Sequence, residues 1–210
     1  MWPGTEKTEE LLAGARDGDG DAINRLLERH RDALQRMVQM RLDQKIRRRI
    51  GVSDVVQEVL VQANRRLHDY LAQPTMPFHL WLRHIAKDRI IDAHRRHRGS
   101  AKRSVDRERP LVVAATDDRS TIQLAAQLCN DELTPSAAAA QQEIVRRVEQ
   151  AISELADQDA EIMIMRHYEQ LSNQEVAQSL NLSEPAASMR YLRAVRRLRA
   201  MLTGSELEGD

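Results

Sequence analysis

Aromatic residues, glycine and proline are all scarce in this chain. Of its 210 residues 3% are aromatic and 41% hydrophobic, with 8 glycines and 6 prolines. Sheet proteins need aromatic and β-branched residues in their strands, and glycine and proline in their many turns. The composition therefore predicts an all-α fold of small helical domains, and the length allows one or two of them.

A second cysteine and a long apolar run are also missing. Cys129 stands alone, which excludes an internal disulfide and is typical of a reducing compartment. The longest purely apolar stretch is Leu111 to Ala115, whereas a membrane-spanning helix needs roughly 20 such residues. The first ten residues are polar and acidic, unlike a signal peptide. These features predict a cytoplasmic protein with no membrane insertion.

Net charge is zero, but the charges are unevenly distributed. The 32 basic and 32 acidic residues balance, which taken alone argues against a nucleic-acid partner. Residues 83–109, however, hold ten basic and four acidic residues, while residues 117–161 hold three basic and ten acidic ones. This asymmetry predicts two basic surfaces separated by an acidic connector.

Residues 172–202 have the pattern of two helices joined by a short turn. Ser172 is a good N-cap, and Glu175 three residues later completes a capping box. Asn181 suits the left-handed conformation that ends many helices. Ser183 is a second N-cap, and Pro185 fits the first turn of the helix after it. The spacing predicts a helix-turn-helix, which places the start of its second helix in the DNA major groove.

This second helix is expected to have an apolar face and a basic face. Met189, Leu192, Val195 and Leu198 recur every three residues and are predicted to face a core. Five arginines lie between residues 190 and 199 with no acidic residue among them. DNA binding explains this pattern, and a solvated basic face on an ordinary helical hairpin is the alternative. The side chains offered to DNA are Glu184, Ala187, Ser188, Arg190, Arg193 and Arg197.

The first half of the chain predicts three more helices, over residues 21–49, from a cap at Ser53 onward, and over residues 78–97. In the middle helix, one face is apolar and would pack in a core: Val56, Leu60, Ala63 and Leu67. A second face is acidic and amide-bearing with one apolar residue: Asp54, Gln57, Glu58 and Val61. Either contact with a partner protein or simple solvation explains this second face.

The helix over residues 78–97 becomes strongly basic towards its end. Trp81 is interpreted as a core residue or as one that stacks on nucleic-acid bases. His94 and His97 lie three residues apart, but no cysteine or second pair completes a zinc site. No nucleophile, metal cluster or phosphate-binding loop is found, so the sequence predicts no enzyme, no metal and no cofactor.

These elements predict two domains joined by a linker. Residues 1–98 form the first domain and residues 136–204 the second, a four-helix domain that contains the helix-turn-helix. Residues 99–135 lack a sustained pattern and are predicted as the linker, with one short helix over residues 120–129.

The order of these motifs resembles the extracytoplasmic-function (ECF) group of the sigma-70 family of RNA polymerase sigma factors. Residues 54–59, DVVQEV, are similar to the motif that binds core polymerase in that family. Residues 78–98 look like its helix that reads and melts the −10 promoter element, and residues 155–202 resemble its −35-reading domain. The resemblance covers most of residues 15–98 and 140–202.

This resemblance implies a sigma factor that binds core RNA polymerase and directs promoter-specific transcription initiation. The residues implied at the polymerase β′ clamp helices are Asp54, Gln57, Glu58 and Val61. Those implied at the −10 element are Trp81, Arg89, Asp92, Arg95 and Arg96. Those implied at the −35 element are Glu184, Ala187, Ser188, Arg190, Arg193 and Arg197. The implied partners are the β′ and β subunits, promoter DNA and an anti-sigma factor.

Two other functions are compatible with the residues alone. A dimeric helix-turn-helix regulator would bind a palindrome without polymerase, and it would leave the face of Asp54, Gln57 and Glu58 idle. A helical interaction module would use its arginines only for solubility.

Overall fold

The structure is a computed structural model that describes residues 2–42, 44–47, 49–98, 118–128 and 138–204. Within these ranges every regular element is helical, which confirms the all-α prediction. The chain divides into two compact units, Met1–Val105 and Asp106–Asp210, which are called the N-terminal and C-terminal units below. None of the helices in the described ranges combines the length and the apolar character needed to cross a membrane.

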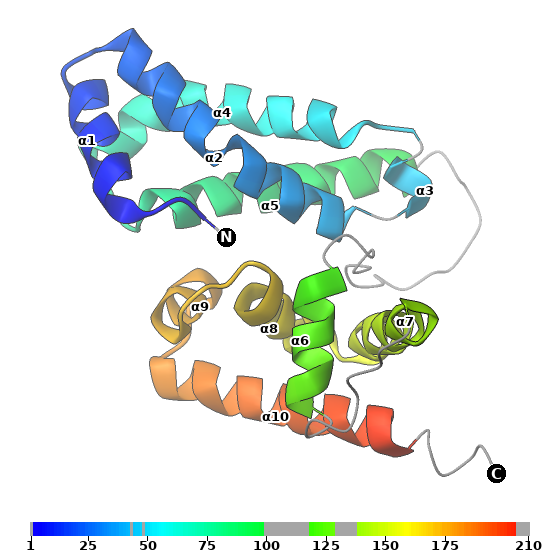
Figure 1. The fold of residues 1–210 in the computed structure, drawn as a ribbon. Coiled ribbons are helices and arrows are strands. Elements are labelled where there is room, and N and C mark those ends of the chain that lie inside the picture. Colours follow the sequence, from blue (N-terminus) through cyan, green and yellow to red (C-terminus); the bar gives the residue numbers. More distant parts are fainter. Residues whose placement is uncertain (1, 43, 48, 99–117, 129–137, 205–210) are drawn as a thin grey trace. The chain divides into compact units, whose positions relative to one another are not determined.

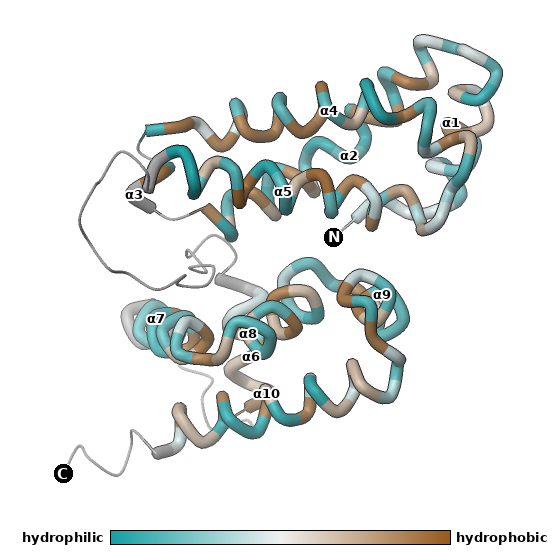
Figure 2. The backbone as a smooth tube through the Cα atoms, turned by 180° about the vertical axis from the view of Figure 1, so that it is seen from behind, coloured by the Kyte–Doolittle hydropathy of each residue, from teal (hydrophilic) through white to brown (hydrophobic). Residues whose placement is uncertain are grey.

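The N-terminal unit is built on three long helices, α2, α4 and α5, that pack against one another, with the shorter α1 and α3 added (Figure 1). Its elements are α1 (Thr5–Arg16), α2 (Gly20–Arg41), α3 (Gln44–Arg47), α4 (Val52–Ala72) and α5 (Phe78–Arg98). The predicted core face of α4 is confirmed, since Val56, Leu60, Ala63 and Leu67 are all buried. Figure 2 shows the matching alternation of apolar and polar segments along this helix.

The scarce aromatic residues are concentrated at one place in the N-terminal unit. The Phe78 ring, at the start of α5, lies 5.0 Å from His30 of α2 and 5.6 Å from Tyr70 of α4. Trp81 lies 4.7 Å from Tyr70, and Trp2 lies 6.3 Å from His30. This cluster therefore ties α2, α4, α5 and the residues before α1 together, because ring contacts of this kind add to the burial of apolar area.

Two helical predictions for this unit are corrected. The helix expected over residues 21–49 ends at Arg41, because Leu42 adopts an extended backbone and its side chain enters the core. Helix α1 was not predicted, since its buried face consists of little more than Leu11, Leu12 and Ala15. Its turn into α2 depends on Gly18, whose φ of 82° favours glycine.

The C-terminal unit holds the helix-turn-helix and a helix that precedes it by many residues (Figure 1). Its elements are α6 (Asp118–Leu128), α7 (Ala138–Glu154), α8 (Asp157–Met163), the π-helix η1 (Ile164–Tyr168), α9 (Asn173–Leu180) and α10 (Glu184–Gly204). Helix α6 lies within the range predicted as linker, yet it packs on α7 and η1. Thr121 is buried there with its hydroxyl 3.0 Å from the Tyr168 hydroxyl, so α6 belongs to the core of this unit.

Candidate interfaces for protein and nucleic acid

The turn between α9 and α10 has the cap geometry that the sequence predicted. The Ser172 hydroxyl accepts a hydrogen bond from the Glu175 amide at 3.2 Å, and the Glu175 carboxylate accepts one from the Ser172 amide at 2.7 Å. Asn181 is left-handed with φ 53° and ψ 47°, and the Ser183 hydroxyl accepts a hydrogen bond from the Ala186 amide. These local bonds begin and end both helices at defined residues.

A contact that was not predicted fixes the two helices to each other. The Asn173 side-chain amide, in the first turn of α9, donates a hydrogen bond to the Glu184 carbonyl oxygen at 3.1 Å. Because the two residues are 11 positions apart, no helical periodicity could have indicated this bond. The bond joins the start of α9 to the start of α10, and it therefore helps to set the angle between these two helices.

The buried face of α10 differs from the one predicted. Ala187, Ala194, Leu198 and Leu202 are buried, whereas Met189 and Leu192 are 54% and 45% exposed. The small alanines are the residues that let α10 pack closely on the neighbouring helices, and the sequence prediction favoured the larger side chains instead. Ala187 is therefore wrong as a DNA-facing residue, because its side chain has no exposed surface.

The five arginines of α10 fall into two groups, and two of them serve the fold. Arg197 donates to the Asp159 carboxylate of α8 at 2.5 Å while its side chain stays 58% exposed, so this ion pair competes with the predicted contact to DNA. Arg199 donates to the carbonyl oxygens of Leu128 and Gln127 at 2.9 and 3.3 Å. These carbonyls lie at the end of α6, where helices leave such groups unpaired, so Arg199 fastens α6 to α10.

The other three arginines differ from Arg197 and Arg199 in having no partner within the described part of the protein. Arg193 and Arg196 are exposed and Arg190 is half-buried. Among the residues that the structure describes, none of the three makes a hydrogen bond or an ion pair with a protein side chain. Arg196 was not in the predicted set, although its position three residues after Arg193 placed it near that group. Unpaired arginines on one helix face are suited to phosphates and to guanine edges.

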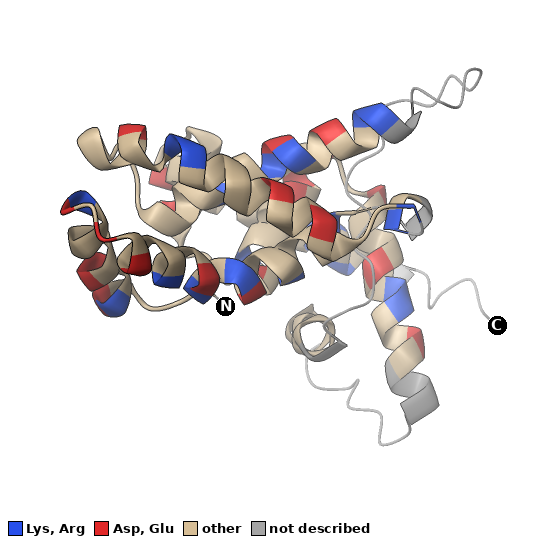
Figure 3. Cartoon of the chain, turned by 90° about the horizontal axis from the view of Figure 1, so that it is seen from above, with Lys and Arg blue, Asp and Glu red and all other residues tan. Residues whose placement is uncertain are grey.

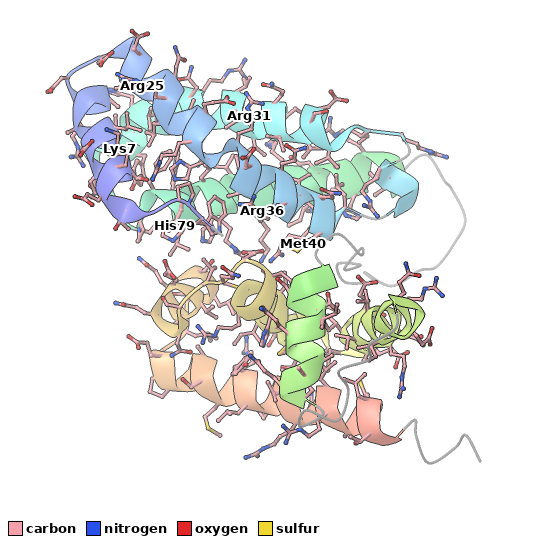
Figure 4. The ribbon with its side chains drawn as sticks, viewed as in Figure 1. Lys7, Arg25, Arg31, Arg36, Met40 and His79 are labelled. Carbon is pink, nitrogen blue, oxygen red and sulfur yellow. The ribbon has the colours of Figure 1, made fainter. Side chains whose placement is uncertain are left out.

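A second predicted group, on α4, is brought together by the structure. Gln57 and Val61 are exposed and Glu58 is half-buried, and all three lie on one side of the helix. Shallow hollows flank them: one towards α2, which Arg25 and Arg31 line (labelled in Figure 4), and one towards α5. Val61 borders both hollows and is 48% exposed, so an apolar spot lies at the centre of a polar surface.

Asp54, the fourth predicted polymerase-binding residue, also caps the start of α4. Its carboxylate accepts a hydrogen bond from the Gly51 amide at 3.2 Å, and α4 begins at Val52. The predicted cap at Ser53 is therefore wrong, since the chain already turns into the helix at Gly51. A carboxylate in the first turn also interacts favourably with the helix dipole.

The predicted polymerase-binding and −10 residues meet in the hollow between α4 and α5. The Arg96 guanidinium donates to the Glu58 carboxylate at 3.0 Å, and Arg89 pairs with Asp92 at 3.2 Å. Arg95 is exposed, while Trp81 is half-buried against Tyr70 and Phe78. Figure 3 shows basic and acidic residues interspersed over the helices that are seen from above.

His94 makes a contact of its own, whereas the side chain of His97 lies outside what the structure describes. His94 lies with its Nε2 3.2 Å from the Arg41 carbonyl oxygen. Across the described ranges no three His, Cys, Asp or Glu side chains are grouped closely enough to hold a metal ion.

Two buried histidines link stability to pH. Burial in the core lowers the pKa of His30 from 6.5 to about 4. Burial, with Arg166 beside it, lowers the pKa of His167 from 6.5 to about 4, and its Nε2 lies 3.0 Å from the Tyr191 hydroxyl. Both are neutral in the fold at pH 5, whereas the unfolded chain takes up protons below about pH 6.5.

We therefore expect the free energy of unfolding to fall as the pH drops from 6.5 towards 4. At pH 5 each histidine should account for a loss of about 2 kcal/mol relative to neutral pH. Chemical denaturation between pH 7 and 4.5 would measure this. The His167→Gln variant can still reach Tyr191 but does not titrate, so it should show a shallower pH dependence. An unchanged slope in this variant would contradict the assignment.

Comparison with known proteins finds similarity over both units. Residues 26–100 match the family described as Sigma-70 region 2, and residues 145–198 match Sigma-70, region 4. The chain is 28% identical over 197 residues to the RNA polymerase sigma factor CnrH of Cupriavidus metallidurans, which covers 91% of this chain and 92% of CnrH. A solved structure of CnrH in complex with the cytosolic domain of CnrY matches with a TM-score of 0.59 and 24% identity, covering 95% of this chain and 99% of that one.

Proposed function

Because the chain belongs to the ECF group of the sigma-70 family and is a sigma factor that directs transcription initiation, we propose that its two units contact different parts of the polymerase and promoter. The observation that carries this proposal is the outward set of Arg190, Arg193 and Arg196 on the second helix of the helix-turn-helix. The polymerase supplies the chemistry, and this chain supplies promoter selection.

The N-terminal unit binds the β′ clamp helices through α4. Gln57, Glu58 and Val61 form the contact, with Val61 as the apolar centre and Asp54 both capping α4 and bordering the surface. A buried apolar residue surrounded by polar groups is the usual composition of a protein interface. The C-terminal unit contacts the β subunit.

The same unit binds the −10 element through α5. Arg95, Arg96 and Arg89 contact phosphates, with Asp92 beside them, and Trp81 supports the unpaired strand. Opening DNA costs roughly a few kcal/mol per unstacked step, which such contacts offset. Glu58 binds Arg96 in the free protein. Polymerase would take up Glu58 and −10 DNA would take up Arg96, so the binding of either one breaks this ion pair.

The C-terminal unit reads the −35 element through the first turns of α10. Glu184, Ser188, Arg190 and Arg193 face the bases there, and Arg196 contacts the backbone. The protein works in the cytoplasm. The structure of CnrH with the cytosolic domain of CnrY supports a further proposal, that an anti-sigma factor binds this chain as well.

Reconstituted transcription tests the proposal against the dimeric regulator. With core polymerase from the same cell, the protein should start transcripts at promoters that share two unlike boxes, near −35 and −10. A footprint of two symmetric half-sites obtained without polymerase would favour the dimeric regulator instead.

A further inference from the structure

Met189 is the most exposed of the large apolar residues in the described part of the chain, at 54%. It lies on α10, in the helix that the proposed function places in the −35 major groove. An exposed methionine on a helix with three outward arginines has no role in the core. A partner that binds this face would match it best by offering an apolar group within a strongly anionic surface.

Met189 lies at the centre of the outer face of α10, the face opposite its buried residues. Each residue turns an α-helix by about 100°, so Met189 lies about 200° around the axis from the buried Ala187. Pro185 precedes it by four residues and Arg193 follows it by four, so the three side chains form one row. Met189 thus lies between the groove end of the helix and its outward arginines.

The charge of α10 identifies the partner. Its only acidic residue is Glu184 in the first turn, and Arg190, Arg193 and Arg196 follow Met189 by one, four and seven residues. This surface complements an anionic partner such as DNA. The one apolar group that the major groove exposes is the C5 methyl of thymine, which apolar side chains contact.

We propose that Met189 is a specificity-determining residue that reads thymine in the −35 element by packing on its C5 methyl. This proposal rests on the −35 role of the C-terminal unit. Methionine suits the task because its flexible, polarizable side chain adapts to the position of the methyl. Removing one methyl from such a contact should lower affinity about three- to fourfold.

Substitution of deoxyuridine for thymidine tests this, since the two differ only by the methyl group. Each thymine on both strands of the −35 box is replaced in turn, and binding of the complete holoenzyme is measured. With the wild-type protein, deoxyuridine at one position or two adjacent ones should weaken binding about three- to fourfold. The Met189→Ala holoenzyme should bind the normal promoter about as weakly and should not respond to deoxyuridine.

Two variants serve as controls. Met189→Leu keeps an apolar side chain and should retain the response to deoxyuridine. Leu192→Ala removes an apolar residue of similar exposure, 45%, from the same helix and should leave the response intact. Both residues are exposed, so the variants are expected to fold, and thermal unfolding checks this.

The outcomes separate this proposal from the proposed function. If scrambling the whole −35 box has no effect, the −35 role itself fails. If the box matters but contains no thymine, or deoxyuridine has no effect, or Met189→Ala stays as sensitive as wild type, only the Met189 proposal is overturned. If Met189→Ala instead weakens binding of core polymerase, the methionine belongs to a protein interface and the proposal is likewise overturned.

Discussion

Changing Val61 to arginine is expected to lower the affinity for core RNA polymerase at least tenfold. Val61 lies between two hollows on α4 and is 48% exposed, which is the arrangement of an interface centre. An arginine there would replace the apolar centre of the contact with a long charged side chain, and removing a charge from water on binding costs several kcal/mol unless it is well paired. A tenfold loss corresponds to about 1.4 kcal/mol, which is less than this cost, so tenfold is a lower bound on the loss of affinity. Arginine favours helix at least as well as valine, so α4 should remain folded.

A matched control exists on α5. Ile91 is another exposed apolar residue, at 43%, and it borders neither hollow. Ile91→Arg should therefore bind core polymerase like the wild type in a quantitative pull-down. If Val61→Arg binds equally well, the polymerase surface is not on this face of α4. Asp54→Ala is less suitable for this test, because it also removes the carboxylate that caps α4.

Replacing Arg190 and Arg193 together by alanine is expected to abolish selection of the −35 element by the holoenzyme. A good bidentate contact from arginine to guanine is worth about 1–3 kcal/mol, so losing two should cost about 2 kcal/mol or more. The salt dependence of binding separates contacts to phosphates from contacts to bases. Each lost phosphate contact reduces the slope of log affinity against log salt by about 1, whereas a lost base contact relaxes specificity at one position.

The other α10 arginines provide the control for this prediction. Arg197 is bound to Asp159 and Arg199 to the end of α6, so alanine at these positions should lower the free energy of unfolding. Their effect on the choice of −35 sequence should be small. The assignment would be wrong if the Arg190/Arg193 variant kept its −35 preference, or if the Arg197/Arg199 variant lost it without losing stability. Binding titrations at several salt concentrations, together with denaturation curves, measure both effects.

Local features of the fold were predictable because they depend on residues within one helical turn. The capping box of Ser172 and Glu175 spans three residues, and the left-handed Asn181 needs only its own side chain. Likewise, the apolar repeat of α4 correctly indicated its buried face. In each case the physical cause lies within the pattern itself. Helix α1 shows the limit of this reasoning, since a few apolar residues in a polar segment predict little alone.

What depended on distant residues was decided only by tertiary structure. Arg96 meets Glu58 across 38 positions, and Arg197 pairs with Asp159 across another 38. Small Ala187, rather than Met189, faces the core because close packing between helices favours the smaller side chain. The sequence by itself thus determined an all-α chain with a helix-turn-helix and an acidic stripe on α4. Which arginines remain free for DNA, and where a methionine is left exposed among them, follows from helix packing, because a helical pattern specifies faces but not what covers each of them.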